Sequence, residues 1–288
     1  MERFLDVAIA GLLLGGLYAL IAMGMSLQYG VARVFNIAHG EFIMLGAMTT
    51  WTLYTVFNIS PLVAVVICGP LAFVLGFIIH RTMFRKLQSL SANQGVFESN
   101  SMLASFGLMF VIQNIAFLAW GPEIRTYNYL METVSIGGAL FGARRLVTLG
   151  FAIAIGVIFY IFLARTRIGK AIRAAGQDPS TAGLMGVNIN WVLALCFGLG
   201  AAMAGIAGVL ISMSYPDSAN MGQEYLTVAI IVVVLGGLGS IPGSFIGGFL
   251  LGIIGSIVSF YEPGLNMAAY YAIFVILLLV RPRGIMGR

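Results

Sequence analysis

The chain has 288 residues, of which 60% are hydrophobic and only 9% are charged, and its formal net charge is +5. Soluble domains carry about 25% charged residues. Too few charges are therefore present to cover a water-exposed surface, and a disordered chain, a collagen, a coiled coil and a disulfide scaffold are excluded as well. The composition predicts an all-α polytopic membrane protein.

Long charge-free segments follow one another along the chain. Residues 7–32 form the first, and residues 42–79 form two spans separated by a turn at 58–61. Further spans are expected at residues 102–120, 146–164, 191–212 and 264–280, and residues 225–261 are interrupted by the glycine-rich stretch 236–243. Because a crossing needs about 20 helical residues, we expect eight to nine transmembrane helices, some of them broken or re-entrant. Residues 225–235 are too short to cross alone and are expected to form a half-helix.

The basic residues are gathered in three places rather than spread along the chain. Most of the 15 Lys and Arg side chains are in three clusters, at Arg81, Arg85 and Lys86, at Arg165, Arg167, Lys170 and Arg173, and at Arg281, Arg283 and Arg288. Positive charge favours the cytoplasmic side of a membrane. We therefore expect the C-terminus inside and the N-terminus outside, with Arg144 and Arg145 as a mild violation. Clusters between apolar segments argue for membrane topology and against nucleic-acid binding.

The polar loop 165–190 carries its own helix signals. A basic helix is expected at residues 166–175, broken by Gly176 and Gln177. Asp178 and Pro179 then provide an N-cap and a first-turn proline, and Gly186 is placed to end the short helix that follows. A capped surface helix of this kind is either a docking element or an ordinary amphipathic connector, and spacing alone leaves both open.

Polar residues open two of the apolar segments. Asn36, His39 and Glu41 precede one, and Asn220 and Glu224 precede another. Under the orientation above, the two would have opposite topology, as in an inverted repeat. Ionisable residues in a membrane segment are functional-site candidates by default, so these five residues are candidates for a translocation path. Capping at the membrane surface is the alternative.

Several kinds of chemistry are not supported. Two histidines and two cysteines without ligand spacing (Cys68 and Cys196) give no metal site. The stretch 236–243 lacks the lysine of a nucleotide-binding loop, and no catalytic triad is suggested. We therefore expect no enzyme and no cofactor in this chain, and we expect the glycine pairs at positions 11/15, 243/247 and 248/252 to serve close helix packing.

Four motifs resemble the branched-chain amino-acid ABC transporter permeases. They are residues 30–47 (GVARVFNIAHGEFIMLGA), 166–175 (TRIGKAIRAA) continuing through 182–188 (AGLMGVN), 234–243 (VLGGLGSIPG) and 279–284 (LVRPRG). They occur in the family's order and cover the chain from end to end. Within the family, the chain is similar to the shorter of the two permeases of leucine/isoleucine/valine importers.

This resemblance implies that residues 1–288 form a single transmembrane domain of a binding-protein-dependent importer in the bacterial inner membrane. Its implied partners are a second homologous permease, two cytoplasmic ATPases that carry ATP and Mg²⁺, and a periplasmic substrate-binding protein. Loop 165–190 would be the segment that couples to an ATPase. The residues implied for coupling are Arg173, Gly176, Asp178, Pro179, Leu184, Met185 and Gly186. The binding protein would dock on outer loops near Glu123, Glu132, Asp217 and Glu262.

Three other functions remain as alternatives. A permease of the same superfamily could carry urea, an amide, an aromatic acid or a sugar. A secondary carrier would need charged residues in the middle of its spans, and only Glu41 and Glu224, at helix starts, come near this. A structural scaffold would need neither broken spans nor a capped cytoplasmic helix.

Overall fold

The computed structural model describes residues 2–136 and 139–287 and is almost entirely helical. The helices are α1 (Glu2–Ala32), α2 (His39–Phe57), α3 (Pro61–Ile79), a π-helical turn η1 (His80–Phe84), α4 (Arg85–Leu90), α5 (Gln94–Trp120), α6 (Ala143–Arg165), α7 (Arg167–Gln177), α8 (Pro179–Leu184), α9 (Ile189–Ser212), α10 (Met221–Gly236), α11 (Ile241–Tyr261), a 3₁₀ turn η2 (Pro263–Leu265) and α12 (Asn266–Val280). The antiparallel strands β1 (Thr133–Ile136) and β2 (Ala139–Gly142) form a hairpin.

The prediction of an all-α membrane protein is confirmed. Among the described residues, seven helical segments are long and apolar enough to cross a membrane, and α10 is a shorter apolar helix of 16 residues. With α2, which has 19 residues, the bundle contains nine helices in the described part of the chain. The half-helix expected before the glycine-rich stretch corresponds to α10. The predicted start of the fourth span, at residue 102, was wrong, because α5 begins at Gln94, where the Asn93 side chain accepts a hydrogen bond from the backbone N–H of Val96 at 2.9 Å.

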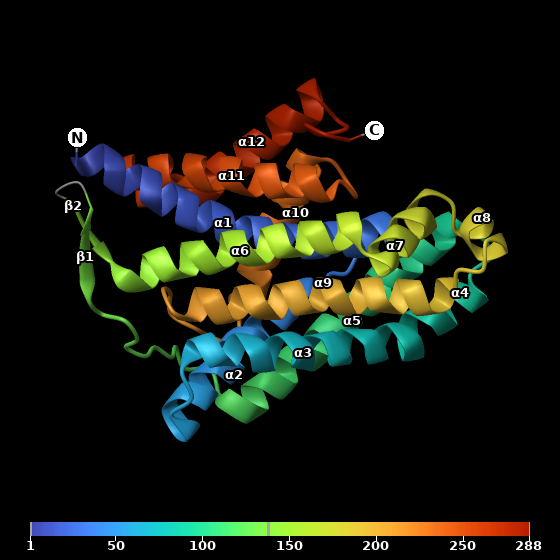
Figure 1. Cartoon of the computed structure of the whole chain (residues 1–288), viewed down its shortest axis with the longest axis horizontal. Helices are drawn as coiled ribbons and strands as arrows, with labels where there is room; N and C mark the ends of the chain where they lie inside the picture. Colours follow the sequence, from blue (N-terminus) through green and yellow to red (C-terminus); the bar gives the residue numbers. More distant parts are fainter. Residues whose placement is uncertain (1, 137–138, 288) are drawn as a thin grey trace.

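The long helices lie side by side, and α1 runs through the bundle from one end to the other (Figure 1). It packs against α6, α9 and α11. The approach of α1 to α11 is a backbone contact, because a Cβ atom added to Gly252 would lie 2.1 Å from the backbone nitrogen of Gly15. Small residues permit this spacing between membrane helices, so the predicted packing role of these glycines is confirmed.

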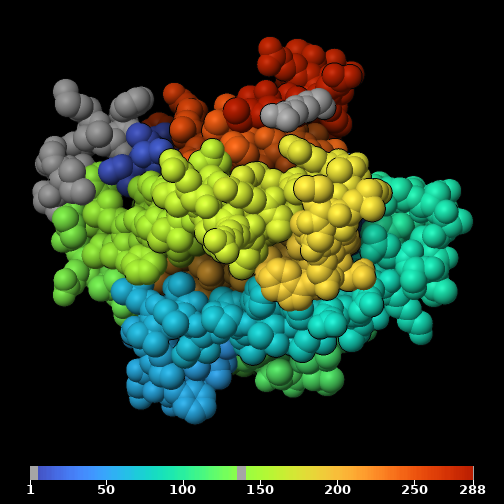
Figure 2. Space-filling model, turned by 45° about the vertical axis from the view of Figure 1, so that its right-hand side comes forward, coloured from blue at the N-terminus to red at the C-terminus, as the bar shows by residue number. Residues whose placement is uncertain are grey.

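The two ends of the bundle differ in charge. Figure 1 shows α4, α7, α8 and the C-terminus at one end, and the N-terminus with the β1–β2 hairpin at the other. All three basic clusters named above reach the first of these ends, which we call the basic end, although Arg288 lies outside the described residues. Figure 2 shows yellow residues of α7 and α8 and teal residues of α4 at the surface of this end. The grouping is what the positive-inside rule requires of a cytoplasmic face.

Helices α2 and α10 begin part-way along the length of the bundle rather than at one of its ends. After α1 the chain turns at Arg33 (φ 54°), and residues 34–38 return between the helices with Val34, Asn36 and Ala38 fully buried. The segment 33–41 is therefore re-entrant. The first turns of α2 and α10 meet there, since a Cβ atom on Gly40 would lie 2.0 Å from the carbonyl oxygen of Gly222.

The two broken helices then diverge. The far end of α2 is near the α5–β1 connection, where the Tyr54 hydroxyl donates to the carbonyl of Asn128 at 2.8 Å. The far end of α10 is at the basic end, where the backbone N–H of Ile285 donates to the carbonyl of Leu235 at 2.8 Å. Helices that start together and run in opposite directions are the arrangement predicted for an inverted repeat.

Candidate functional site

The start of α2 is held by a buried network of amide and imidazole groups. The Asn36 side-chain amide donates to Oε1 of Gln28 at 3.2 Å, and Gln28 Nε2 donates to the carbonyl of Phe197 at 3.0 Å. His39 contacts the same Gln28 oxygen through Nδ1 at 3.2 Å and the carbonyl of Ile21 through Nε2 at 3.1 Å. All of these side chains are 0% exposed. The network joins α1, α2 and α9 and is closed to solvent.

Gln28 is a functional candidate that the sequence analysis missed. The signal available was a single amide in an otherwise apolar span, eight positions before Asn36. Both ring nitrogens of His39 face oxygen acceptors, whereas a neutral imidazole donates from only one nitrogen. Turning the Gln28 amide would satisfy Nδ1 but would place Oε1 against the Phe197 carbonyl. A neutral His39 ring can therefore donate to only one of the two oxygen atoms that its nitrogens face.

We expect His39→Ala to reduce transport more than it reduces binding of the ATPase partner proposed below. The variant removes the ring that joins Ile21 to Gln28, and a buried polar group left without a partner costs about 1–3 kcal/mol. The start of α2 would loosen, while the basic end would keep its shape. Uptake and co-purified ATPase should be measured on the same membranes. Unchanged uptake would indicate that His39 serves only as a capping residue.

Glu41 lies where the first turns of α2 and α10 cross. Its side chain is 1% exposed, its Oε1 lies against Gly222, and Oε2 has no hydrogen-bond partner among the described residues. Two helix N-termini place their positive dipole ends beside this carboxyl. Of the five predicted path residues, the structure therefore places Asn36, His39 and Glu41 together in the interior.

The other two predicted path residues are at the surface. Asn220 and Glu224 are exposed at the start of α10, and Asn220 Oδ1 accepts a hydrogen bond from Nε2 of Gln113 on α5 at 2.9 Å. Asn114, the next residue on α5, is also exposed. Neither Gln113 nor Asn114 was singled out from the sequence, although paired amides in an apolar span are an available signal.

The loop between α6 and α9 contains the short capped helix that the sequence predicts. The Asp178 carboxylate accepts hydrogen bonds from the backbone N–H groups of Ser180 at 2.9 Å and Thr181 at 3.2 Å, and thereby caps α8. Hydrogen bonds, led by that from the Thr181 hydroxyl, hold the pKa of Asp178 below its usual value. Gly186 follows with a φ of 85°, as a helix-ending glycine should.

The tip of this loop presents two large apolar side chains to solvent. Leu184 is 88% exposed and Met185 is 81% exposed. They belong to the last residue and the C-cap of α8, which lies at the basic end (Figure 1). Exposed apolar groups rimmed by polar residues are typical of protein interaction sites.

One detail of the loop was predicted wrongly. Helix α7 does not break at Gly176 but continues through Gln177 to the Asp178 cap. Gly176 lies against α1, where an added Cβ atom would be 3.3 Å from Val31 Cγ2. Arg173, another predicted coupling residue, donates to the carbonyl of Leu163 at the end of α6. The loop is thus tied to both α1 and α6.

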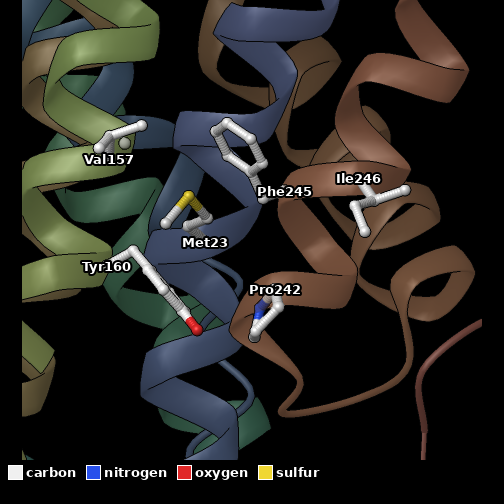
Figure 3. A pocket seen from close by; sticks show the side chains of 7 residues that line it. Met23, Val157, Tyr160, Pro242, Phe245 and Ile246 are labelled. Carbon is white, nitrogen blue, oxygen red and sulfur yellow. The ribbon is translucent and has the colours of Figure 1, made fainter. Parts of the chain in front are cut away.

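A cavity of about 180 Å³ lies between α1, α6 and α11 (Figure 3). It is lined by Met23, Gly156, Val157, Tyr160, Pro242, Phe245 and Ile246. The Tyr160 hydroxyl is the polar side-chain group among these residues. An amino acid carries a charged carboxylate and a charged ammonium group, and neither would find a partner of opposite charge here. The cavity is therefore unsuited to bind a zwitterion.

Asp217 was expected on an outer loop in contact with a docked binding protein, and the structure contradicts this. Its side chain is 0% exposed, and neither carboxylate oxygen has a hydrogen-bond partner among the described residues. Its backbone pairs with Arg125, with N···O distances of 2.8 and 2.9 Å. The Arg125 guanidinium instead lies over the Trp51 ring, 4.1 Å from its centroid. Glu123, Glu132 and Glu262 are exposed, as expected.

Asp217 should make the stability of the protein depend on pH. Burial raises the pKa of Asp217 from 3.8 to about 8, and Tyr127 and Tyr225 are its titratable neighbours. Between these two values the folded chain holds a proton that the unfolded chain releases, so stability falls as pH rises through this window. Asp217→Asn removes the titration. The melting temperature of Asp217→Asn minus that of the parent, both measured in detergent, should increase from pH 5 to pH 8. The increase should be about 2–4 °C for each kcal/mol of stability that the parent loses over this range. A difference independent of pH would contradict this assignment.

No group of three side chains able to hold a metal ion is found within residues 2–136 and 139–287. Cys68 and Cys196 are both free and buried. The arrangement that remains is a helix bundle with two broken helices, a polar surface at the start of α10, and a capped apolar tip at the basic end. Discontinuous helices that meet part-way along a bundle are an arrangement found in inverted-repeat transporters.

Comparison with known proteins agrees with this description. A family model described as "Branched-chain amino acid transport system / permease component" matches residues 7–280. The chain is 30% identical over 305 residues to the high-affinity branched-chain amino acid transport system permease protein BraD of Pseudomonas aeruginosa, covering 99% of this chain and 96% of that protein. It is 32% identical over 301 residues to the corresponding permease LivH of Escherichia coli, with the same coverage. A probable branched-chain amino acid transport permease of Methanocaldococcus jannaschii is 25% identical over 292 residues, covering 94% of this chain and 89% of the relative. The chain belongs to the family of branched-chain amino-acid transport permeases.

Proposed function

We propose that this chain is the permease subunit of an ABC importer for branched-chain or other hydrophobic amino acids in the inner membrane of a bacterium. Residues 1–288 then act as a single transmembrane domain, with the basic end in the cytoplasm. The observation that carries the proposal is the Asp178-capped α8, which holds Leu184 and Met185 almost fully exposed at that end. Full-length similarity to permeases supports it.

The proposed importer needs further subunits. Two cytoplasmic ATPases carry ATP and Mg²⁺, a second homologous permease completes the path, and a periplasmic binding protein delivers the substrate. The residues that we assign to coupling with the ATPase are Arg173, Gly176, Asp178, Pro179, Leu184, Met185 and Gly186. Leu184 and Met185 enter a groove of the ATPase, and Asp178 and Gly186 hold the helix that presents them.

Motion of the ATPases reaches the bundle through contacts of α7. Gly176 lies against Val31 at the end of α1, and Arg173 is bonded to the Leu163 carbonyl at the end of α6. A displacement of α8 is therefore passed as a rigid-body movement to the two helices that flank the cavity in Figure 3. We assign the path to Asn36, His39, Glu41, Asn220 and Glu224. The first three of these are buried and would become accessible only when α2 and α10 separate.

The proposal is tested by purification from the native host followed by transport. A tagged chain extracted in mild detergent should bring down an ATPase with nucleotide-binding motifs and a second permease. Vesicles containing the whole assembly should take up leucine, isoleucine or valine only with ATP and the binding protein. Deletion of residues 179–186 should leave membrane insertion intact and abolish uptake. Recovery of the chain alone, with uptake that needs no ATP, would favour a secondary carrier. ATP-driven uptake of a different solute would support the importer function and would change only the proposed substrate.

A further inference from the structure

A groove opens between the turn η1, helix α4 and helix α5 near the basic end (Figure 1). The Thr82 hydroxyl on its wall already donates to the carbonyl of Ile78 at 2.8 Å, so the ammonium group of Lys86 is the polar group left to meet a ligand. We call this the boundary groove. Its volume is about 420 Å³, and it is lined by Thr82, Met83, Lys86, Leu87, Leu90 and Ala104.

The π-helical turn η1 fixes which side of the chain faces the boundary groove. Phe84 is 0% exposed, and its ring centroid lies 4.9 Å from that of Phe197 on α9. With this ring held in the core, residues four positions apart share the opposite, outward face. Turns of this kind are frequent at functional sites. The exposed residues of that face are Thr82, Lys86 and Leu90.

The boundary groove crosses the edge of the hydrocarbon core. Arg81 is 20 positions after Pro61, the first residue of α3, which is about 30 Å of helix and equals the thickness of the core. On α5, Ala104 is 16 positions before Trp120, or about 24 Å from the opposite end. Ala104 therefore lies inside the core, and Lys86, five positions beyond Arg81, lies outside it.

The charges around the boundary groove favour an anion. Arg81, Arg85 and Lys86 occur within six positions, and all three are exposed. Between residues 61 and 120 the only acidic residue is Glu98, and its Oε1 accepts a hydrogen bond from Nε2 of Gln94 at 3.2 Å. Basic pockets between transmembrane helices at a cytoplasmic face are suited to anionic lipid headgroups.

The remaining walls of the boundary groove need an apolar ligand. Leu90 is 74% exposed, and Leu103, beside Ala104 on α5, is 72% exposed. A soluble phosphate compound would cover Lys86 and leave these side chains uncovered, whereas an acyl chain would cover them. Helix α5 also leaves room for such a chain, because only 17% of its most apolar 18-residue window is buried, against 83% for α9.

We propose that the boundary groove binds one anionic phospholipid. The Lys86 ammonium donates to the phosphate, with Arg85 adding positive charge beside it. An acyl chain lies along Met83 and Leu87 toward Ala104, inside the hydrocarbon core. The bound lipid thereby fills the space between α4 and α5 and holds α5 against the bundle. This site is separate from the path and from the ATPase contact proposed above, and it does not depend on which solute the chain carries.

The proposal is tested by covalent capture of lipid in membranes. The chain, purified with the subunits that accompany it, is placed in phosphatidylcholine vesicles that contain a small fraction of phosphatidylglycerol with a photoreactive acyl chain. Phosphatidylcholine with the same photoreactive chain is the comparison. After illumination, mass spectrometry identifies the labelled peptides. We expect the anionic lipid to label residues 82–104 at least about tenfold more than the zwitterionic lipid, because each basic residue favours an anionic headgroup by roughly a factor of five.

Two pairs of variants separate the contributions of charge and shape. Lys86→Gln should lower the labelling about fivefold. Lys170→Gln makes the same charge change on α7 at the same end of the bundle and should leave the labelling unchanged. Ala104→Trp fills the boundary groove without changing its charge and should also lower the labelling. Leu103→Trp, one position away on a side chain that is 72% exposed, should not.

Four outcomes would overturn the proposal. Equal labelling by the two lipids would mean that the groove holds unselected lipid, and equal losses in Lys86→Gln and Lys170→Gln would mean that the charge of the whole basic end is responsible. Full competition by glycerol phosphate would assign the site to a soluble anion. Labelling that occurs in the isolated chain and disappears in the assembled importer would assign the groove to a partner protein.

The result is independent of two possible complications. Lys86 is an exposed side chain, so its replacement tests the site even if Ala104→Trp does not fold. ATP-driven uptake is measured separately on the parent assembly. Absence of uptake would contradict the importer function without affecting the lipid site, and absence of selective labelling would contradict the lipid site without affecting the importer function.

Discussion

Replacing Leu184 and Met185 together with glutamate should abolish ATP-driven uptake while leaving the chain folded in the membrane. Both side chains are more than 80% exposed, so the change removes no internal packing. Fully burying a Leu or Met side chain contributes about 1.5–3 kcal/mol. Because 1.4 kcal/mol is a factor of ten in affinity, we expect the ATPase to bind about 100-fold more weakly, or worse. Detergent pull-down measures the affinity, and vesicle uptake measures the consequence.

The matched control exchanges the same two residues without changing their chemistry. The double variant Leu184→Met and Met185→Leu keeps the apolar tip and should retain both ATPase binding and uptake. If the glutamate variant binds ATPase as well as the parent does, α8 is an ordinary connector and the coupling assignment is wrong. If both double variants lose binding equally, shape rather than apolar character decides the contact.

Gly40→Ala should destabilise the chain far more than a single methyl group ordinarily would. The added Cβ atom would lie 2.0 Å from the carbonyl oxygen of Gly222 and 3.0 Å from Leu226 Cβ. The first of these neighbours is backbone and cannot rotate away. Overpacking in a core typically costs about 1–3 kcal/mol, and we expect the upper part of that range because α2 and α10 must move apart as units. The melting temperature in detergent and the yield of monodisperse protein are the measurements.

Gly150→Ala is the control for this prediction. Gly150 is also inside a helix, α6, but has nothing within 4 Å of its Cβ direction. Alanine is favoured over glycine in a helix by up to about 1 kcal/mol, so this variant should be neutral or slightly stabilising. Equal melting temperatures for Gly40→Ala and Gly150→Ala would show that the α2–α10 contact is looser than described here.

Features that depend on neighbouring residues in the chain were predictable from the sequence. The turn at Asn58–Pro61, the Asp178 cap and the terminating Gly186 each require a residue type with a specific local conformation, and the structure has them where predicted. The spans followed from charge-free length alone. The predicted helix break at Gly176 was wrong because glycine can either end a helix or permit close packing within one. The sequence does not distinguish these two roles.

Features that depend on which side of a helix is covered were not predictable. Asn36, His39 and Asn220 were all singled out as polar residues at helix starts, yet two are buried against Gln28 and one is exposed beside Gln113. The difference arises from contacts between segments far apart in the chain. For the same reason Asp217, in a loop between apolar segments, was expected at the surface and is instead enclosed between α9, α10 and the segment around Arg125.

The exposed amide on α5 has a consequence for how the protein is made. In the importer proposed above, a chain that is synthesised before its partner permease leaves the exposed Asn114 side chain in contact with lipid tails. Such an orphan subunit is an exposed target for membrane proteases until the second permease arrives. Its cellular lifetime should therefore be set by the synthesis rate of its partner, and balanced co-expression of the two genes should raise the amount of this chain without any change in its own sequence.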